Sequence, residues 1–219
     1  MIKIEHVEIY GWEAAIRGMR NPMNSWDKSD TAFWCYPEEG VVHKIGENDL
    51  KLMTTLSKAG SDHGKFLRMI TVTLDITAPL YWWKEFDTYK VGTVANSCST
   101  MHKIHAKEFA LDDFSYEHLF EGVDPVTADW MDNLGLMWVI INVLNDCRYR
   151  FLETKDKRYW WQMIQLLPSS YNQKRTVQLN YQVLKSMYHA RKAHKLDEWV
   201  EFCKWCETLP YFKEICIDC

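Results

Sequence analysis

The chain has 219 residues, of which 47% are hydrophobic and 14% aromatic, with a formal net charge of −4. This is enough apolar material for one sizeable core, so we expect a single domain over residues 1–219. The mildly acidic balance argues against general binding to nucleic acid or to membranes, and an anionic ligand would need a local basic cluster.

The segment MIKIEHVEIYGWEAA contains acidic residues and no uninterrupted apolar run, so it does not have the pattern of a signal peptide. No stretch approaches the length of a membrane span. The seven cysteines are an odd number in a chain with no export signal. We therefore expect reduced thiols and a cytoplasmic protein.

Residues 2–9 alternate between apolar and polar and predict a strand, which Gly11 breaks. A short helix is expected over residues 12–19, ended by Asn21-Pro22. Residues 23–47 contain proline and glycine and are predicted to be mostly loop.

A second helix is expected to run through Ala59, with Asn48 or Asp49 as its cap and Gly60 as its C-terminal stop. The run from Met69 to Ala78 is rich in β-branched residues and predicts a strand.

Pro79 suits the first turn of a following helix, because it lacks an N–H group and its φ angle is fixed. The stretch after Lys90 is small and polar and is predicted to be a loop. A loop of this kind can bring N–H groups and hydroxyls close to a ligand, and an ordinary polar loop is the alternative.

Residues 103–120 have apolar side chains at helical spacing, with a group of possible metal ligands between them. These are Asp112, Asp113, Glu117 and His118. Their neighbours favour a solvated acidic face, and the set does not match a well-defined site, so we expect no metal. Two apolar helices are then expected over residues 129–150 and 160–167, the second ended by Pro168.

The segment 180–191 predicts a helix in which four residues recur every three or four positions and so share one face. These are Asn180, Leu184, Met187 and Arg191. Arg191 has two interpretations: an ordinary residue that covers apolar surface or pairs with Asp197 or Glu198, or a functional group.

The helical pattern continues through Cys206. Cys203-x-x-Cys206 and Cys216-x-x-Cys219 suggest zinc, but the nine residues between the pairs are fewer than zinc ribbons use. Plain reduced cysteines are the favoured interpretation.

Several residues at compatible distances match the signature segments of one known family. They are Ala78-Pro79, Asn96, Ser99, Leu167-Pro168, Asn180, Leu184 and Arg191. Tyr171 resembles the tyrosine that follows Leu-Pro in the family but lies one residue closer to Pro168. Through them the sequence resembles the flavin-dependent thymidylate synthases, the ThyX family, over most of its length.

The resemblance implies an α/β (α+β) fold with a central antiparallel sheet flanked by helices. It also implies a homotetramer with active sites between subunits. The implied activity is FAD-dependent transfer of a one-carbon group from methylenetetrahydrofolate to dUMP or a related pyrimidine deoxynucleotide, with NADPH as reductant.

The resemblance assigns FAD contacts to Tyr89, Lys90, Asn180, Gln182, Ser186, His63 and Lys65. It assigns nucleotide contacts to Asn96, Ser97, Ser99, Thr100, Met101 and Arg191. Arg191 is the implied catalytic residue, since a guanidinium can stabilise negative charge on the pyrimidine without changing its own protonation.

The sequence departs from the family signature at its charged positions. Counted from Ala78-Pro79, the family's R-H-R triplet falls on Thr88-Tyr89-Lys90, and counted back from Asn96 it falls one residue later; neither register restores it. Ser97, Met101 and His102 replace a Glu, an Arg and a Tyr. Charge-assisted hydrogen bonds are the strong ones, so much of the charge that holds FAD and dUMP is lost. The alternatives are a non-catalytic ThyX-like protein that binds or sequesters a nucleotide, and a purely structural tetramer that binds neither ligand.

Overall fold

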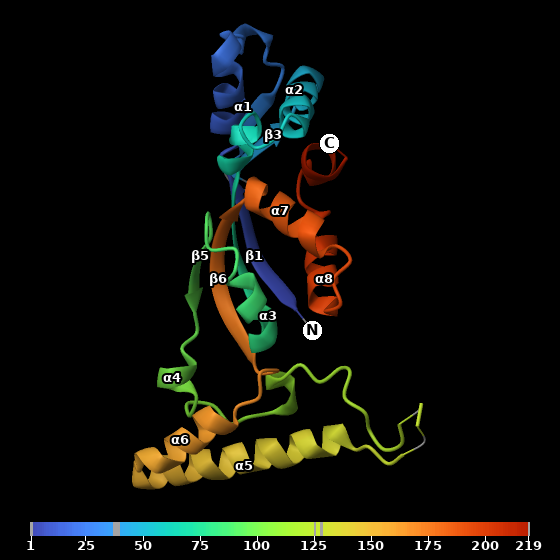
Figure 1. Cartoon of the computed structure of the whole chain (residues 1–219). Coiled ribbons are helices and arrows are strands. Elements are labelled where there is room, and N and C mark those ends of the chain that lie inside the picture. Colours follow the sequence, from blue (N-terminus) through green and yellow to red (C-terminus); the bar gives the residue numbers. More distant parts are fainter. Residues whose placement is uncertain (1, 37–39, 125, 128, 219) are drawn as a thin grey trace. The chain divides into compact units, whose positions relative to one another are not determined.

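The computed structural model describes residues 2–36, 40–124, 126–127 and 129–218 (Figure 1). It contains an antiparallel four-stranded sheet flanked by helices, which confirms the predicted fold class. The strand order is β1-β4-β6-β5, and a second sheet pairs β2 with β3. The four strands of the main sheet are β1 (Lys3–Tyr10), β4 (Thr71–Pro79), β6 (Asn172–Asn180) and β5 (Val94–Ser97).

The chain divides into two compact units, each made of segments far apart in the sequence. The α5–α6 unit comprises residues 76–88 and 96–175 with the N-terminal residues through Lys3. The α7–α8 unit comprises residues 4–75, 89–95 and the segment from 176 to the C-terminus. The expectation of a single domain over residues 1–219 stays a prediction.

In the α5–α6 unit, the long helix α5 (Asn133–Thr154) packs along α6 (Lys157–Leu166). Asp132 and Asp156 accept hydrogen bonds from the first turns of these helices and cap them. Helix α3 (Leu80–Phe86) follows Pro79, as predicted. The apolar faces of α5 and α6 enclose one core cluster, whose buried members include Phe109, Phe114, Met137, Ile141, Leu144 and Met163.

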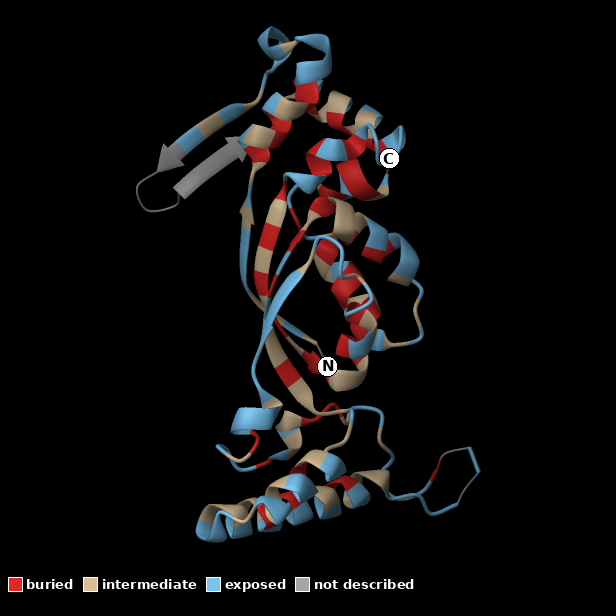
Figure 2. Cartoon of the chain, turned by 60° about the vertical axis from the view of Figure 1, so that its left-hand side comes forward, coloured by how far each residue is buried: buried red, intermediate tan, exposed pale blue. Residues whose placement is uncertain are grey.

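In the α7–α8 unit, helices α7 (Tyr181–Arg191) and α8 (Asp197–Cys206) pack on each other, and their inner sides are buried (Figure 2). Helices α1 (Trp12–Arg20) and α2 (Glu47–Lys58) belong to the same unit. Side chains that are fully buried here include Met53, Leu184, Met187, Trp199, Phe202 and Phe212. No helix among the residues that the structure describes is both long and apolar enough to cross a membrane.

The prediction that residues 23–47 are mostly loop is wrong. Strands β2 (Ala32–Tyr36) and β3 (Gly40–Lys44) form an antiparallel hairpin there. Aromatic and β-branched residues in both strands, separated by a short segment that contains a proline, give the local preference for a hairpin. Residues 37–39 lie outside the described residues.

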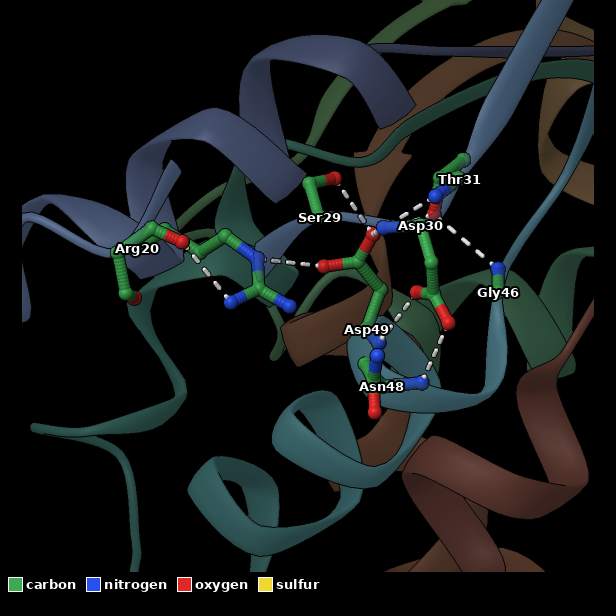
Figure 3. A network of polar contacts seen from close by, with 8 residues as sticks. Arg20, Ser29, Asp30, Thr31, Gly46, Asn48 and Asp49 are labelled. Carbon is green, nitrogen blue, oxygen red and sulfur yellow. Dashed lines mark hydrogen bonds and ion pairs between the residues drawn. The ribbon is translucent and has the colours of Figure 1, made fainter. Parts of the chain in front are cut away.

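A buried ion pair lies at the base of this hairpin, where Arg20 Nε donates to Asp49 Oδ1 at 2.7 Å (Figure 3). The other carboxylate oxygen of Asp49 accepts from the Ser29 hydroxyl at 2.7 Å and the Thr31 hydroxyl at 2.6 Å. Burial raises the pKa of the Asp49 carboxyl, but the hydrogen bonds from Thr31, Ser29 and Arg20 outweigh burial and lower it from its ordinary value.

Helix α2 begins at Glu47, so the predicted cap at Asn48 or Asp49 is wrong. Asp30 satisfies the exposed N–H groups instead, because its carboxylate accepts from the backbone nitrogens of Asn48 at 2.9 Å and Asp49 at 3.1 Å (Figure 3). Gly60, with a φ of +100°, follows the end of α2 as predicted.

Three further local predictions need correction. The stretch after Lys90 is not all loop, because it includes β5 and the short helix α4 (Thr100–Lys103). Residues 109–120 form no α-helix. They contain a 3-10 turn at Leu111–Asp113, stabilised by a hydrogen bond from the Ala110 N–H to Asp113 at 2.9 Å. The helix predicted to continue through Cys206 is interrupted between α7 and α8.

Candidate functional site

Arg191, in the last turn of α7, is held by polar contacts within the α7–α8 unit. Its Nε donates to the Tyr89 hydroxyl at 2.9 Å, and one terminal nitrogen lies 3.0 Å from Nε2 of His194. Tyr89 is 102 residues away in sequence, in the segment that precedes β5. The structure therefore brings together two residues that the sequence assigned separately to the FAD and nucleotide sites.

Two aromatic rings also lie close to the Arg191 guanidinium. Its central carbon lies 5.0 Å from the ring centroid of Trp199 and 5.6 Å from that of Tyr89. Trp199 is fully buried, and such cation–π contacts are worth about 0.5–2 kcal/mol. We call Tyr89, Arg191, His194 and Trp199 the Arg191 cluster. His194 and Trp199 were not predicted, because they belong to the turn after α7 and to α8.

The segment that carries Tyr89 packs closely against the start of α7. Gly92 has a φ of +83°, and a Cβ at this position would lie 3.0 Å from Cγ2 of Val183 and 3.4 Å from Nδ2 of Asn180. The Thr93 hydroxyl donates to the Tyr89 carbonyl at 2.7 Å and tightens the turn. This position requires glycine for both its backbone conformation and its space.

Asn180 is the N-cap of α7, and its side-chain oxygen accepts from the Val183 N–H at 3.1 Å. This gives Asn180 a structural role that the sequence pattern did not reveal, although an Asn before a helix is a common cap signal. Its amide nitrogen is the atom that faces Gly92. Asn180 therefore connects the helix that carries Arg191 to the segment that carries Tyr89.

The remaining residues assigned to FAD lie in the same unit. Gln182 faces the 3-10 helix Gly64–Arg68, where a Cβ on Gly64 would be 3.8 Å from its side-chain oxygen. His63 and Lys65 flank Gly64 and are exposed, as is Lys90. The hydroxyl of Ser186 donates to the Gln182 carbonyl at 3.0 Å. The sequence segments around residues 63–65 and 182 are thus adjacent, as a shared site requires.

A small cavity of about 100 Å³ lies in the α5–α6 unit and contains two of the residues assigned to the nucleotide. Ser99 and Thr100 line it from the start of α4, together with Cys98 and Lys103. The start of β6 lines the other side with Tyr171, Asn172, Gln173 and Lys174. We call this the Ser99 cavity.

Hydrogen bonds between β5 and β6 fix the walls of the Ser99 cavity. The Cys98 N–H donates to the Lys174 carbonyl at 2.9 Å, and the buried Gln173 amide donates to the Cys98 carbonyl at 2.8 Å. The Ser99 hydroxyl accepts from the His102 N–H at 3.2 Å and caps α4. The backbone of the cavity is therefore positioned before any ligand arrives.

Arg175 holds the side chain of Gln173 in place through a hydrogen bond. Its Nε donates to the Gln173 side-chain oxygen at 3.0 Å, and a terminal nitrogen pairs with Asp87 at 2.8 Å. The guanidinium carbon lies 4.2 Å from the ring centroid of Trp83. Trp83 in turn donates its indole N–H to the Gln173 carbonyl at 2.8 Å.

The other residues assigned to the nucleotide are not lining residues of this cavity. Asn96 and Ser97 are exposed on β5. Met101 is 48% exposed, and its carbonyl accepts from the Trp160 indole N–H at 3.2 Å. Sequence reasoning missed Lys103, Asn172, Gln173 and Lys174. The polar start of β6 was the available signal, but nothing in the sequence shows that β6 pairs with β5.

Cys203 and Cys206 are free thiols and are buried on the inner side of α8. Burial raises the pKa of both thiols, that of Cys203 to about 11. Within the described part of the chain, no group of three His, Cys, Asp or Glu side chains is placed to hold a metal ion. Cys219, the last residue of the second Cys pair, lies outside the described residues.

Comparison with known proteins identifies the fold. No protein-family model matches the sequence, and no curated protein matches it. Among solved structures, the chain has the fold of the flavin-dependent thymidylate synthases and of the related nucleotide methylases. The resemblance found in the sequence is thus confirmed at the level of the fold.

Two of these structures show how far the likeness extends. ThyX from Helicobacter pylori, crystallised with FAD and dUMP, matches with a TM-score of 0.69 at 16% identity, over 100% of this chain and 99% of that one. The UMP/dUMP methylase PolB from Streptomyces cacaoi, bound with 5-Br dUMP, matches with a TM-score of 0.65 at 15% identity. That match covers 98% of this chain and 94% of PolB.

Proposed function

We propose that this protein is a divergent member of the ThyX family that transfers a one-carbon group to a pyrimidine deoxynucleotide, dUMP or a relative. The observation that carries the proposal is the Arg191 cluster. On a ThyX-like fold, an arginine at the matching position donates a hydrogen bond to Tyr89 and lies against the ring of Trp199. Positioned positive charge of this kind stabilises negative charge that develops on a bound pyrimidine.

Arg191 would act on the nucleotide base. A guanidinium can polarise a carbonyl next to N3 of the pyrimidine without exchanging a proton. The contact with Tyr89 OH and the ring of Trp199 limits its rotation. Orientation of this kind reduces the entropy that must be lost when the reacting groups come together.

FAD would be held by the residues around the start of α7. When bound, FAD supplies the redox chemistry by which a methylene group from methylenetetrahydrofolate becomes a methyl group, with NADPH as reductant. The donors present suit an anionic cofactor, because Lys65, His63 and Lys90 are exposed and Gln182 lies against Gly64. Tyr89, Asn180 and Ser186 complete the set that the resemblance assigns.

The visible absorption spectrum of the purified protein tests the flavin part of the proposal. We expect FAD to bind and its absorption bands to shift when dUMP is added, because base and isoalloxazine would share one site. Assay of methyl transfer to dUMP follows directly. Absence of bound flavin with FAD in excess would overturn the enzymatic proposal.

One observation favours a second candidate, a non-catalytic protein that binds or sequesters a nucleotide. The triplet that is R-H-R in the family is not kept here in either register, and the hydroxyl of Tyr89, which lies in this segment, accepts a hydrogen bond from Arg191. Tight binding of dUMP to a protein that binds no FAD would select this candidate. A chain that binds neither ligand would leave only a structural role.

We further propose that the protein is a homo-oligomer, with a homotetramer as the expected state. Three large apolar residues on α5 are exposed at a spacing of three and four positions: Leu136, Val139 and Val143. This spacing places them on one face of the helix. An exposed apolar stripe of this kind marks an interaction surface. Cytoplasmic location stays a prediction.

A further inference from the structure

A second cavity, of about 170 Å³, lies within the α7–α8 unit and is lined by α1 and by residues 26–33. The lining residues from α1 are Glu13, Ile16, Arg17 and Arg20. At this spacing of three and four positions they share one face of the helix. The facing residues are Trp26, Ser29 and Phe33. We call this the Arg20 cavity, and its lining includes none of the described residues that the resemblance assigns to FAD or to the nucleotide.

Arg20 is buried, with 4% of its side chain exposed, but its hydrogen-bonding capacity is only partly used. Its Nε donates to Asp49 at 2.7 Å, and one terminal nitrogen donates to the Ser25 carbonyl at 3.1 Å. Among the described residues none accepts from the other terminal nitrogen, which carries no dashed line in Figure 3. This nitrogen is also not one of the fully enclosed polar atoms without a partner, so solvent reaches it.

The second terminal nitrogen of Arg20 is therefore a donor group that remains available at the wall of a cavity. Polar groups of a buried side chain are normally paired, and one that is not paired within the protein points to a partner from outside. The nitrogen carries two N–H groups, and an anionic acceptor would form the strongest hydrogen bonds with them.

Arg17 adds a second guanidinium one helical turn before Arg20. Its side chain is 65% exposed, and its ion pair with Glu13 is long, at 4.0 Å. Exposed ion pairs of this kind contribute little, so Arg17 can turn to a ligand at small cost. Two arginines and one glutamate give the lining a net charge of +1, part of which the adjacent Asp49 offsets. This balance favours a monoanion over a dianion.

The remaining walls of the Arg20 cavity are apolar and largely aromatic. Trp26 lies in the 3-10 helix Trp26–Lys28, and its indole N–H donates to the Asn21 side chain at 2.8 Å, which orients the ring. Phe33 is half-buried near the start of β2. Rings of this kind offer a large rigid surface on which a planar apolar group can pack.

The size and the rigidity of the cavity restrict the ligand further. Its volume is below the roughly 300–1,000 Å³ of sites that enclose a drug-sized molecule, so it suits one ring with a short substituent. Arg20 and Ser29 both donate to Asp49, which fixes one wall to the other before any ligand arrives. A preformed site of this kind lowers the cost of binding.

We infer that the Arg20 cavity binds a small aromatic monocarboxylate. The carboxylate lies on Arg20 and Arg17, and the ring packs against Trp26 and Phe33. The planar fork of a guanidinium matches the two oxygens of a carboxylate, which distinguishes such an acid from a neutral ring of the same shape. This site is additional to the proposed one-carbon transfer and uses different residues.

Fluorine NMR of 4-fluorobenzoate, observed while the whole protein is added, measures this binding directly. We expect a Kd of about 1 mM or lower, since very small ligands gain the most free energy per atom. The neutral analogue 4-fluorobenzyl alcohol should bind about tenfold more weakly or worse, because it lacks the charge. Acetate, which lacks the ring, should displace the probe only at about tenfold higher concentration than benzoate does.

Variants of the lining residues test where the probe binds. Arg17→Gln and Trp26→Ala change exposed side chains and should each weaken binding about fivefold or more. Arg20→Lys keeps a positive charge beside Asp49 but removes the available terminal nitrogen, and should weaken binding about tenfold. If Arg20→Lys does not fold, as judged by circular dichroism, the other two variants still decide.

Arg150→Gln is the matched control, because Arg150 is also an exposed arginine in an ion pair with a residue one helical turn earlier, Asp146. It should bind 4-fluorobenzoate like the unsubstituted chain, and so should Arg191→Lys. Affinity that is unchanged in both Arg17→Gln and Trp26→Ala would overturn the inference, as would no binding at about ten times the expected Kd. Affinity that falls in Arg191→Lys, with displacement of the probe by dUMP, would place the probe at the Arg191 cluster and overturn it as well.

Discussion

At the scale of single residues, the position of Arg191 depends on groups from three separate segments. Its own helix supplies the backbone, Tyr89 supplies a hydroxyl, and α8 supplies Trp199. The helical spacing of Asn180, Leu184 and Arg191 was readable in the sequence, and so was a functional interpretation of Arg191. Its aromatic partners were not, because contacts across 102 residues leave no local pattern.

Arg191→Lys should weaken dUMP binding about tenfold, or roughly 1.4 kcal/mol, while the fold is kept. An ammonium keeps the charge but loses the planar contact with Trp199 and the fixed Nε bond to Tyr89. Isothermal titration with dUMP measures the effect. Lys192→Gln, at the next and exposed position, should bind dUMP like the unsubstituted chain. Equal affinity in the Arg191→Lys variant would contradict a role for the guanidinium plane.

Asp49→Asn should lower the free energy of unfolding by about 3–5 kcal/mol, because it leaves the buried Arg20 guanidinium without its ionic partner. Urea denaturation at pH 7 measures this loss. Asp62→Asn, at an exposed position just after α2, is the control and should change stability little.

The Asp49 carboxylate also makes the free energy of unfolding depend on pH. Its folded-state pKa lies below the ordinary value of 3.8, so its contribution to stability is fully present above that value and is lost as pH falls through the folded pKa. We expect the unfolding free energy of the unsubstituted chain to fall more steeply below pH 4 than that of Asp49→Asn. Parallel curves for the two proteins would show that Asp49 does not contribute.

At the scale of helices and strands, the sequence predicted an element correctly where its apolar residues recur at strand or helix spacing within that element. Strands β1 and β4 and helices α1, α3 and α7 lie where alternation or helical spacing predicted them. The β2–β3 hairpin was missed because its strands are short and flank a proline. The Ser99 cavity was only partly predictable, since Gln173 and Cys98 meet across 75 positions.

Gly92→Ala should destabilise the protein and also weaken dUMP binding. Alanine at a φ of +83° is strained, and its Cβ would press on Val183 at 3.0 Å and displace the segment that carries Tyr89. Gly60→Ala is a matched control, because its φ is +100° but no atom lies within 4 Å of the added Cβ.

Both glycine variants should therefore lose about 1 kcal/mol or more from backbone strain, measured by urea denaturation. Only Gly92→Ala should change nucleotide affinity. If Gly60→Ala weakens dUMP binding as much as Gly92→Ala does, the close packing of the Tyr89 segment on α7 is not what positions Arg191.

At the scale of the whole molecule, the apolar stripe of α5 predicts association of identical chains. Val139→Glu should lower the oligomeric state measured by analytical ultracentrifugation, since a charge in the middle of the stripe opposes its burial. Lys84→Glu, on an exposed part of α3, should leave the state unchanged. A Val139→Glu protein with the same mass as the unsubstituted assembly would place the interface elsewhere.

The hydrogen bonds around Cys98 have a consequence for how such proteins diverge and are recognised. Its N–H and C=O groups join β6 through main-chain atoms and one glutamine, so the course of the chain here depends little on the identities of residues 97, 101 and 102. Those positions can change in evolution while the backbone keeps its path. A signature defined by side chains can then change without a change of fold, and this chain shares its fold with solved structures although no family model matches it.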